Sequence, residues 1–275
     1  MRQQKIGYIG GGNMARCLVG GLLNTGWQPT DILVSDPDPD QRKFFESQLA
    51  VATTADNGTV VATCPIVVLA IKPQAAKAAL LALKPAFQTH RPLLVSIIAG
   101  LRERDMRRWL AAEVPIVRAM PNTPALVGSG AAGLYANQHV GGVQRDEAES
   151  LLRAVGVTVW LEDEDLLDVV TALSGSGPAY FMLFMENLEE AAIDHGLAPE
   201  TAHLLTLETC LGAAKLAMES PDSLSELRRR VTSPGGTTER ALEIMKRDQL
   251  GKVLKTALDG AAQRARELGE MLGAD

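Results

Sequence analysis

The sequence has 275 residues, of which 46% are hydrophobic and 22% charged, and its formal net charge is −6. This length and composition are typical of a globular protein with enough material for two modest cores. Because the acidic balance offers no cationic field to nucleic acid or to an anionic membrane, we expect a small-molecule partner and no nucleic-acid or membrane partner.

Neither a targeting signal nor a metal-binding pattern is apparent in the sequence. No cationic stretch with an apolar core precedes Lys5, and no run of about 18 to 20 uninterrupted apolar residues follows, so we expect a cytoplasmic protein. The three cysteines lack C-x-x-C spacing, and the four histidines form no pair at helical spacing. The sequence therefore predicts neither a disulfide framework nor a metal site.

The first part of the chain alternates short β-branched runs with helical stretches, which is the pattern of βαβ units and a parallel sheet. The expected strands are Lys5–Gly10, Asp31–Ser35, Ile66–Ala70, Leu93–Ile97 and Ile116–Ala119, with a less regular one near Val51. The expected crossover helices are Met14–Asn24, Pro39–Ser47, Asn57–Thr63, Gln74–Leu83 and Arg104–Ala111. This order predicts a doubly wound sheet of the Rossmann type.

A Gly-rich stretch through Gly133, a helix at Arg145–Ala154, a strand at Thr158–Leu161 and an acidic turn complete the first domain, expected over residues 1–165. Residues 166–275 are helical in period and predict an all-α domain for dimerisation and substrate binding. The fold class is therefore α/β, an N-terminal Rossmann-type sheet followed by an all-α domain. The expected helices are Pro178–His195, Pro199–Met218, Leu224–Val231, Thr238–Lys246 and Leu250–Leu272.

The apolar surface of these helices exceeds what one domain of this size needs to cover itself. The last helix shows this most clearly, because its apolar residues recur at steps of three or four along one face. We interpret the surplus as the interface of a homo-oligomer. The residues of that stripe are Leu250, Val253, Leu254, Ala257, Leu258, Ala261, Ala265, Leu268 and Leu272.

The turn after the first strand, Gly10-Gly-Gly-Asn-Met-Ala15, matches the pattern G-x-G-x-x-A and opens an amphipathic helix. Glycine at position 10 permits a tight turn, and glycine at position 12 lets the backbone approach a pyrophosphate at the helix N-terminus. The pattern alone is weak, and its alternative is an ordinary strand-to-helix turn. Its position between a strand and a helix favours dinucleotide binding.

The end of the second strand is expected to reach the adenosine ribose. Asp36 there would accept from the ribose hydroxyls and repel a 2′-phosphate, whereas Ser35 with a nearby cation, Arg42 or Lys43, would favour the phosphate. Alternatively, Asp36 only forms the turn before Pro37. The sequence leaves the choice between NADPH and NADH open.

Lys72 follows a strand at the sheet edge where open parallel sheets bind ligands. Pro73 is expected to hold Lys72 in an extended conformation, so that its backbone faces the cofactor and its ammonium reaches an anion. The alternative is a solvated surface lysine.

The segment Thr232–Thr238 (Thr-Ser-Pro-Gly-Gly-Thr-Thr) lies between two expected helices. Free N–H groups at a helix start, close backbone approach at Gly235 and Gly236, and the hydroxyls of Ser233 and Thr237 would together bind a carboxylate. The alternative is a helix connection with a threonine cap.

Read in order, five segments resemble the pyrroline-5-carboxylate reductase family over essentially the whole chain. They are Gly10–Ala15, Ala70–Pro73, Met120–Pro124, Ser174–Tyr180 and Arg230–Thr238, and the last two are far more specific than the glycine turn. The resemblance implies hydride transfer from a nicotinamide cofactor to the C=N bond of 1-pyrroline-5-carboxylate, giving L-proline. It also implies interlocked dimers that commonly pack into decamers.

The resemblance further implies roles for single residues. Thr238 and Lys72 would be catalytic, with Thr238 beside the ring nitrogen. The cofactor would be NADPH, with NADH as the alternative. The substrate would contact Ser233, Gly235, Gly236, Thr237 and Thr238. The cofactor would contact Ile9, Gly10, Gly11, Gly12, Asn13, Met14, Ser35, Asn57, Ala70, Ile71, Lys72, Pro73, Ala99 and Gly100.

Two rival functions predict different residues. A related imine reductase or a β-hydroxyacid-dehydrogenase-like enzyme would want a lysine or another proton donor early in the helical domain, and Pro178–His195 contains no lysine. A dinucleotide-sensing regulator without turnover would have no reason to keep the receptor at Ser233–Thr238.

Overall fold

The computed structural model describes residues 5–274 and divides into two compact units. Unit 1 comprises Met1–Ser176 together with Gly260–Asp275, and unit 2 comprises Gly177–Asp259. By packing, therefore, the residues just after 165 and the end of the last helix belong with the first unit. The functional domains expected at 1–165 and 166–275 stay a prediction.

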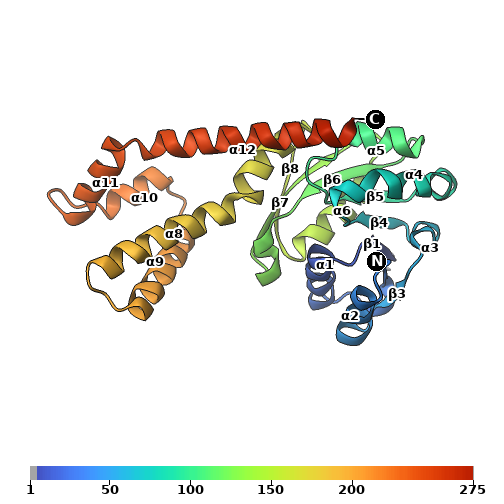
Figure 1. Ribbon diagram of the computed structural model, residues 1–275, viewed down its shortest axis with the longest axis horizontal. Helices are drawn as coiled ribbons and strands as arrows, with labels where there is room; N and C mark the ends of the chain where they lie inside the picture. The colour runs from blue at the N-terminus through green and yellow to red at the C-terminus, as the bar shows by residue number, and fades with distance from the viewer. Residues whose placement is uncertain (1–4, 275) are drawn as a thin grey trace. The chain divides into compact units, whose positions relative to one another are not determined.

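Unit 1 contains an eight-stranded sheet in the order β3-β2-β1-β4-β5-β6-β7-β8 (Figure 1). Its central strands are short runs of buried apolar residues, as expected where helices cover both faces of a parallel sheet. This confirms the predicted α/β class with a Rossmann-type sheet. The strands are β1 (Ile6–Ile9), β2 (Ile32–Ser35), β3 (Ala52–Thr54), β4 (Ile66–Leu69), β5 (Leu93–Ser96), β6 (Ile116–Met120), β7 (Gly130–Ala136) and β8 (Gly156–Trp160).

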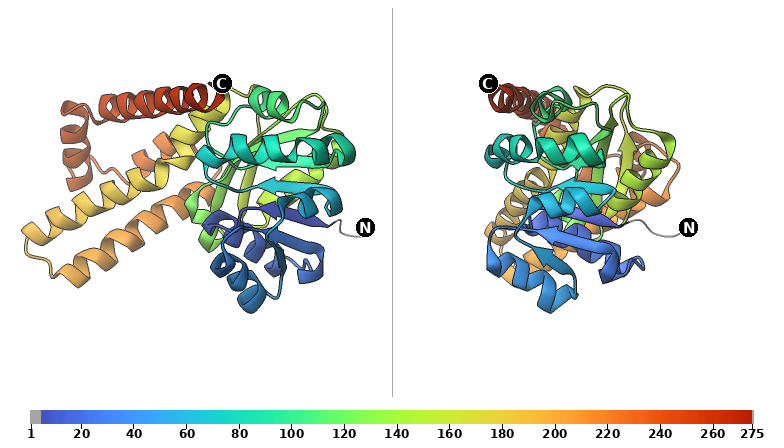
Figure 2. Two further views of the ribbon diagram at one scale, coloured as in Figure 1. Left: turned by 45° about the vertical axis from the view of Figure 1, so that its right-hand side comes forward. Right: turned by 90° about the vertical axis from the view of Figure 1, so that its right-hand side faces the viewer.

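Two apolar clusters hold helices on the two faces of this sheet (Figure 2). One cluster joins α1 (Asn13–Asn24), α2 (Pro39–Leu49) and α6 (Gly142–Arg153) to alternate strand residues such as Tyr8 and Val34. The other contains the intervening strand residues. It joins them to α3 (Asn57–Thr63), α4 (Pro73–His90) and α5 (Glu103–Leu110).

Strand β7 was not predicted, because its glycines resembled a loop. It pairs antiparallel with β6 and parallel with β8, whereas the strands from β1 to β6 are parallel as predicted. Packing explains why position 133 is glycine, because a Cβ there would lie 2.9 Å from the Val170 side chain. Tertiary packing, rather than strand propensity, therefore selects glycine at this position.

Helix α4 is longer than the predicted Gln74–Leu83 and continues through Pro85 to His90. A proline inside a helix removes one backbone hydrogen bond and usually ends the helix. Here Leu83 and Phe87, on either side of Pro85, are both buried in the sheet-facing cluster. Their burial holds the helix across the proline.

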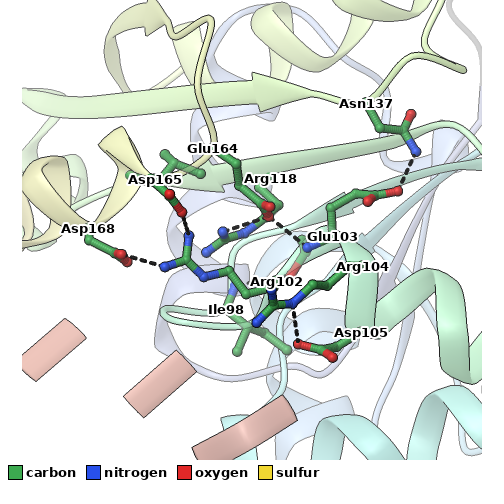
Figure 3. A network of polar contacts seen from close by, with 12 residues as sticks. Ile98, Arg102, Glu103, Arg104, Asp105, Arg118, Asn137, Glu164, Asp165 and Asp168 are labelled. Carbon is green, nitrogen blue, oxygen red and sulfur yellow. Dashed lines mark hydrogen bonds and ion pairs between the residues drawn. The ribbon is translucent and has the colours of Figure 1, made fainter. Parts of the chain in front are cut away.

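An ionic network fixes the segment after β8 to the sheet (Figure 3). Arg102 contacts Asp165 at 2.8 Å and Asp168 at 2.5 Å, while Arg118 of β6 contacts Glu164 at 2.8 Å. Burial lowers the pKa of the Arg118 guanidinium, and the charge of Glu164 opposes that shift. The network holds α7 (Leu166–Val170), an element that was not predicted, and leads into the π-helical turn η3 (Thr171–Gly175).

Unit 2 is entirely helical in its described elements, as predicted. Helices α8 and α9 pack side by side as a hairpin (Figure 2) and expose large apolar side chains, including Phe181, Leu204 and Leu211. Its elements are α8 (Gly177–Asp194), α9 (Pro199–Glu219), α10 (Leu224–Arg230), α11 (Thr237–Arg247) and the first part of α12 (Leu250–Gly273).

Among the described residues, the helical run Leu166–Asp194 is long and apolar enough to cross a membrane, and 22% of its most apolar stretch is buried. One such helix is weak evidence, because core helices of soluble proteins and signal sequences have the same length and hydropathy. Asp168 lies within this run and is paired with Arg102 in the network.

The last helix, α12, uses small residues where it packs within unit 1. Ala262, Ala265 and Gly269 are buried, whereas Val253, Leu254 and Leu268 of the predicted apolar stripe are more than a third exposed. Part of the stripe therefore remains exposed in one chain.

Candidate functional site: a dinucleotide edge and a carboxylate loop

The turn between β1 and α1 has the backbone geometry of a phosphate-binding loop. Gly10 has φ of +100°, and a Cβ there would lie 2.6 Å from the Ala70 carbonyl oxygen, so the fold itself requires glycine. Gly12 is different, because a Cβ there would meet no protein atom within 4 Å. Packing does not explain Gly12, whereas a ligand lying against the turn would.

The start of α1 leaves donors free for that ligand. Gly12 is the N-cap residue and supplies no side-chain hydrogen bond, and the first turn contains no acidic residue. The N–H groups of Asn13 and Met14 and the positive end of the helix dipole are therefore available to an anion. The turn fits a dinucleotide pyrophosphate.

The other predicted cofactor residues follow the ends of neighbouring strands. β2, β1, β4 and β5 lie in that order in the sheet and run parallel. Their carboxyl ends therefore bring the segments Ile9–Met14, Ser35, Ala70–Pro73 and Ala99–Gly100 to one edge. This is the edge at which doubly wound sheets bind ligands.

Lys72 lies at this edge in the conformation that Pro73 was predicted to impose, with φ of −64° and ψ of 142°. It is the N-cap of α4, and its side chain is exposed. The ammonium group is therefore accessible to an anionic ligand.

Ser35 has a role inside the sheet. Its side chain is fully buried, and its hydroxyl lies 2.7 Å from Asn57 Oδ1 and 3.1 Å from the Tyr8 carbonyl oxygen. Asn57 is thus linked to β2 through Ser35. The sequence named both residues but contains no local signal for their contact.

Two segments that carried the family resemblance meet within unit 1. The amide of Asn122, in Met120–Pro124, accepts from the Ala131 N–H at 2.9 Å and donates to the Ser174 carbonyl at 3.0 Å. A Cβ on Gly175 would lie 2.7 Å from Met120 Cε. Asn122 therefore ties η3 to β7. Sequence reasoning named these segments but missed the role of Asn122.

The loop before α11 is built in unit 2 from exposed polar groups. Gly235 has φ of +73°, Gly236 is the N-cap without a side-chain bond, and α11 begins at Thr237. A threonine cap, the alternative to a binding loop, is therefore not what begins α11. Ser233, Thr237 and Thr238 are exposed. The Gly235 N–H donates to the Glu239 carboxylate at 2.7 Å, and the Gly236 N–H donates to the Ser233 carbonyl at 3.0 Å. Both donors are therefore engaged within the chain, and the N–H groups at the start of α11 are the ones open to a ligand.

Comparison with known proteins places these features in one family. A family model described as pyrroline-5-carboxylate reductase dimerisation matches residues 164–268, and one described as NADP oxidoreductase, coenzyme F420-dependent, matches residues 5–100. A pyrroline-5-carboxylate reductase of Pseudomonas aeruginosa is 46% identical over 99% of this chain and 100% of its own length. The chain belongs to the pyrroline-5-carboxylate reductase family. The predicted family resemblance is thereby confirmed.

Solved structures of pyrroline-5-carboxylate reductases have the same fold. The enzyme from Coxiella burnetii is 44% identical, with a TM-score of 0.93 over 96% of this chain and 98% of its own. The enzyme from Plasmodium falciparum, solved with NADP bound, is 28% identical, with a TM-score of 0.86 over 98% of this chain and 99% of its own.

Proposed function

We propose that this protein reduces the C=N bond of 1-pyrroline-5-carboxylate to give L-proline, with NADPH or NADH as the reductant. The observation that carries this proposal is its 46% identity to a pyrroline-5-carboxylate reductase over nearly the full length of both chains. The open glycine turn in unit 1 and the exposed hydroxyls beside the start of α11 in unit 2 support it.

The sheet edge at Ile9–Met14, Ala70–Pro73 and Ala99–Gly100 would hold the dinucleotide. When bound, the nicotinamide supplies the hydride, and the protein supplies position and electrostatics. Gly12 leaves space for the pyrophosphate, and the free N–H groups of α1 bind it. Lys72 adds positive charge at the same edge, where it stabilises an anionic group near the reacting atoms.

The loop Ser233–Thr238 would hold the substrate. Its carboxylate would lie against Gly235 and Gly236 and bind the N–H groups at the start of α11 and the hydroxyls of Ser233 and Thr237. The Thr238 hydroxyl can donate to the imine nitrogen or accept from the iminium N–H. Because a threonine hydroxyl is a poor acid, the proton on nitrogen comes with the substrate or from solvent.

The working protein would be a homodimer or a larger assembly of dimers, with a decamer as the specific proposal. The dimerisation model over residues 164–268 supports the dimer, and the exposed apolar side chains of α8 and α9 are the surface that it would cover. We place the enzyme in the cytoplasm, since its relatives are enzymes of amino-acid metabolism.

The test is oxidation of NADPH and of NADH with 1-pyrroline-5-carboxylate as the acceptor, followed by absorbance and by detection of proline. The matched acceptor is 1-pyrroline, which has the same ring and no carboxylate. We expect turnover with 1-pyrroline-5-carboxylate and a much lower kcat/KM with 1-pyrroline. The second acceptor has no carboxylate for the loop Ser233–Thr238 to bind. No proline with either cofactor would refute the proposal.

A further inference from the structure

We infer that Asp36 makes this protein select NADH over NADPH, an inference that rests on the proposed function. Asp36 directly follows β2, and both of its carboxylate oxygens are held by backbone donors. Oδ2 accepts from the Gly11 N–H at 2.7 Å, and Oδ1 accepts from the Asp38 N–H at 2.9 Å. The negative charge is therefore fixed beside the glycine turn.

That position is where a bound dinucleotide places its adenosine ribose. The pyrophosphate lies at the glycine turn and the helix N-terminus, and an acidic residue after the second strand meets the ribose hydroxyls. The bond from Gly11 to Asp36 joins these two points directly. Gly11 is also fitted to its neighbours, because a Cβ there would lie 3.4 Å from Asp36 Oδ2 and 2.9 Å from the Phe45 ring.

Two of the three groups that could receive a 2′-phosphate, Ser35 and Arg42, have other contacts, whereas Lys43 is exposed. Ser35 is fully buried and within hydrogen-bond distance of Asn57 and of the Tyr8 carbonyl, so its hydroxyl does not face the ribose. Arg42 directs Nη1 at the carbonyl oxygens of Asp36 and Pro37, at 2.7 Å and 3.0 Å. The guanidinium thus holds the backbone of the turn that presents the carboxylate.

The chemical consequence is a difference between two nearly identical cofactors. With NADH, the carboxylate accepts hydrogen bonds from the ribose hydroxyls. With NADPH, the same carboxylate meets a phosphate of like charge, and it cannot turn away without giving up its two backbone donors. This like-charge contact lowers the affinity for NADPH and leaves the affinity for NADH unaffected. We expect an advantage of about tenfold or more for NADH in kcat/KM.

Equilibrium binding separates this inference from catalysis. Adenosine 5′-monophosphate and adenosine 2′,5′-bisphosphate differ only in the 2′-phosphate, and their dissociation constants can be measured by calorimetry on the full-length protein. The wild type should bind the monophosphate more tightly. Asp36→Asn keeps the shape and one of the two acceptor oxygens, here for the Gly11 N–H, but loses the bond from the Asp38 N–H and removes the charge, so the preference should fall by about tenfold. NADH and NADPH should follow the same order.

Asp38→Asn is the matched control. It removes an equal charge two residues away, at the N-cap of α2, where the side chain accepts from the Asp40 N–H. The ratio of the two dissociation constants should change little. If instead the wild type prefers the bisphosphate, or if Asp36→Asn and Asp38→Asn change the ratio equally, the inference is wrong.

The two proposals fail in different ways. Turnover with NADPH preferred over NADH would overturn the role of Asp36 and leave the reductase function standing. Absence of turnover with both cofactors would overturn the function, whereas the ratio for the two adenosine nucleotides would still decide the role of Asp36.

Discussion

Two glycines of one turn, Gly10 and Gly12, are required for different reasons. The backbone of Gly10 and its closeness to Ala70 exclude a side chain, whereas Gly12 faces open space. Glycine at position 12 is therefore required by the ligand rather than by the fold. A substitution there should leave the core undisturbed.

Gly12→Val should abolish binding of NADH and NADPH, because its methyl groups would occupy the space of the pyrophosphate. The circular dichroism spectrum and the melting temperature should stay close to those of the wild type. Gly20→Val is the control, since Gly20 lies in the same helix and a Cβ there also meets nothing within 4 Å. Fluorescence titration with each cofactor measures the difference. Unchanged affinity in Gly12→Val would remove this turn from the cofactor site.

Thr238→Ala should lower kcat/KM for 1-pyrroline-5-carboxylate by about one to two powers of ten, which corresponds to about 1.4–2.7 kcal/mol of lost transition-state binding. Cofactor affinity should barely change. Thr238→Ser keeps the hydroxyl and should retain much more activity. Because Gly236, rather than Thr238, is the N-cap of α11, alanine should not destabilise the helix start. Steady-state kinetics with wild-type values for the alanine variant would refute the assignment.

At the scale of whole elements, the ionic network decides where α7 lies. Arg102 is 10% exposed and pairs with two carboxylates of very different exposure, Asp168 at 2% and Asp165 at 78%. A buried charge that loses its partner is costly, whereas an exposed pair contributes little. The two carboxylates therefore provide a comparison around one guanidinium.

Asp168→Asn should lower the free energy of unfolding by about 3 kcal/mol, and Asp165→Asn by less than about 1 kcal/mol. Urea denaturation at one fixed protein concentration measures both, because an oligomer's stability depends on concentration. Equal losses would show that burial of Asp168 does not determine the strength of its pair with Arg102.

At the scale of the whole molecule, the apolar surface of unit 2 exceeds what a monomer would expose. The family model for dimerisation covers the same residues. We therefore expect a second subunit to bury side chains such as Leu204, which is 59% exposed in one chain.

Leu204→Glu should weaken or abolish dimerisation, since dimer formation would bury an unpaired charge. Leu81→Glu is the matched control: Leu81 is 47% exposed on α4 and lies outside the dimerisation match. Analytical ultracentrifugation should give a smaller species for the first variant and the wild-type species for the second. A dimer of normal stability in Leu204→Glu would show that this part of α9 is not at the interface.

The elements that the sequence predicted well are those whose residues carry a local pattern. β1, β2, β4 and β5 are apolar runs bounded by turn residues, and the predicted limits of α3 agree with the structure. β7 and the extension of α4 through Pro85 were missed, because glycine and proline in those segments are tolerated through contacts with Val170, Leu83 and Phe87. Local propensity contains no information about such contacts.

By itself, the sequence determined the fold class, the glycine turn, the segments at the sheet edge and the family, because period, turn chemistry and motifs are properties of neighbouring residues. Tertiary structure decided what those residues face. Ser35 and Asp36 are adjacent in the chain, and only the packing of β1, β2 and Asn57 shows that the hydroxyl is buried while the carboxylate meets Gly11. Likewise, Asn122 joins β7 to η3 only once the strands have paired. Contacts between distant residues depend on strand order and register, which a single sequence does not encode locally.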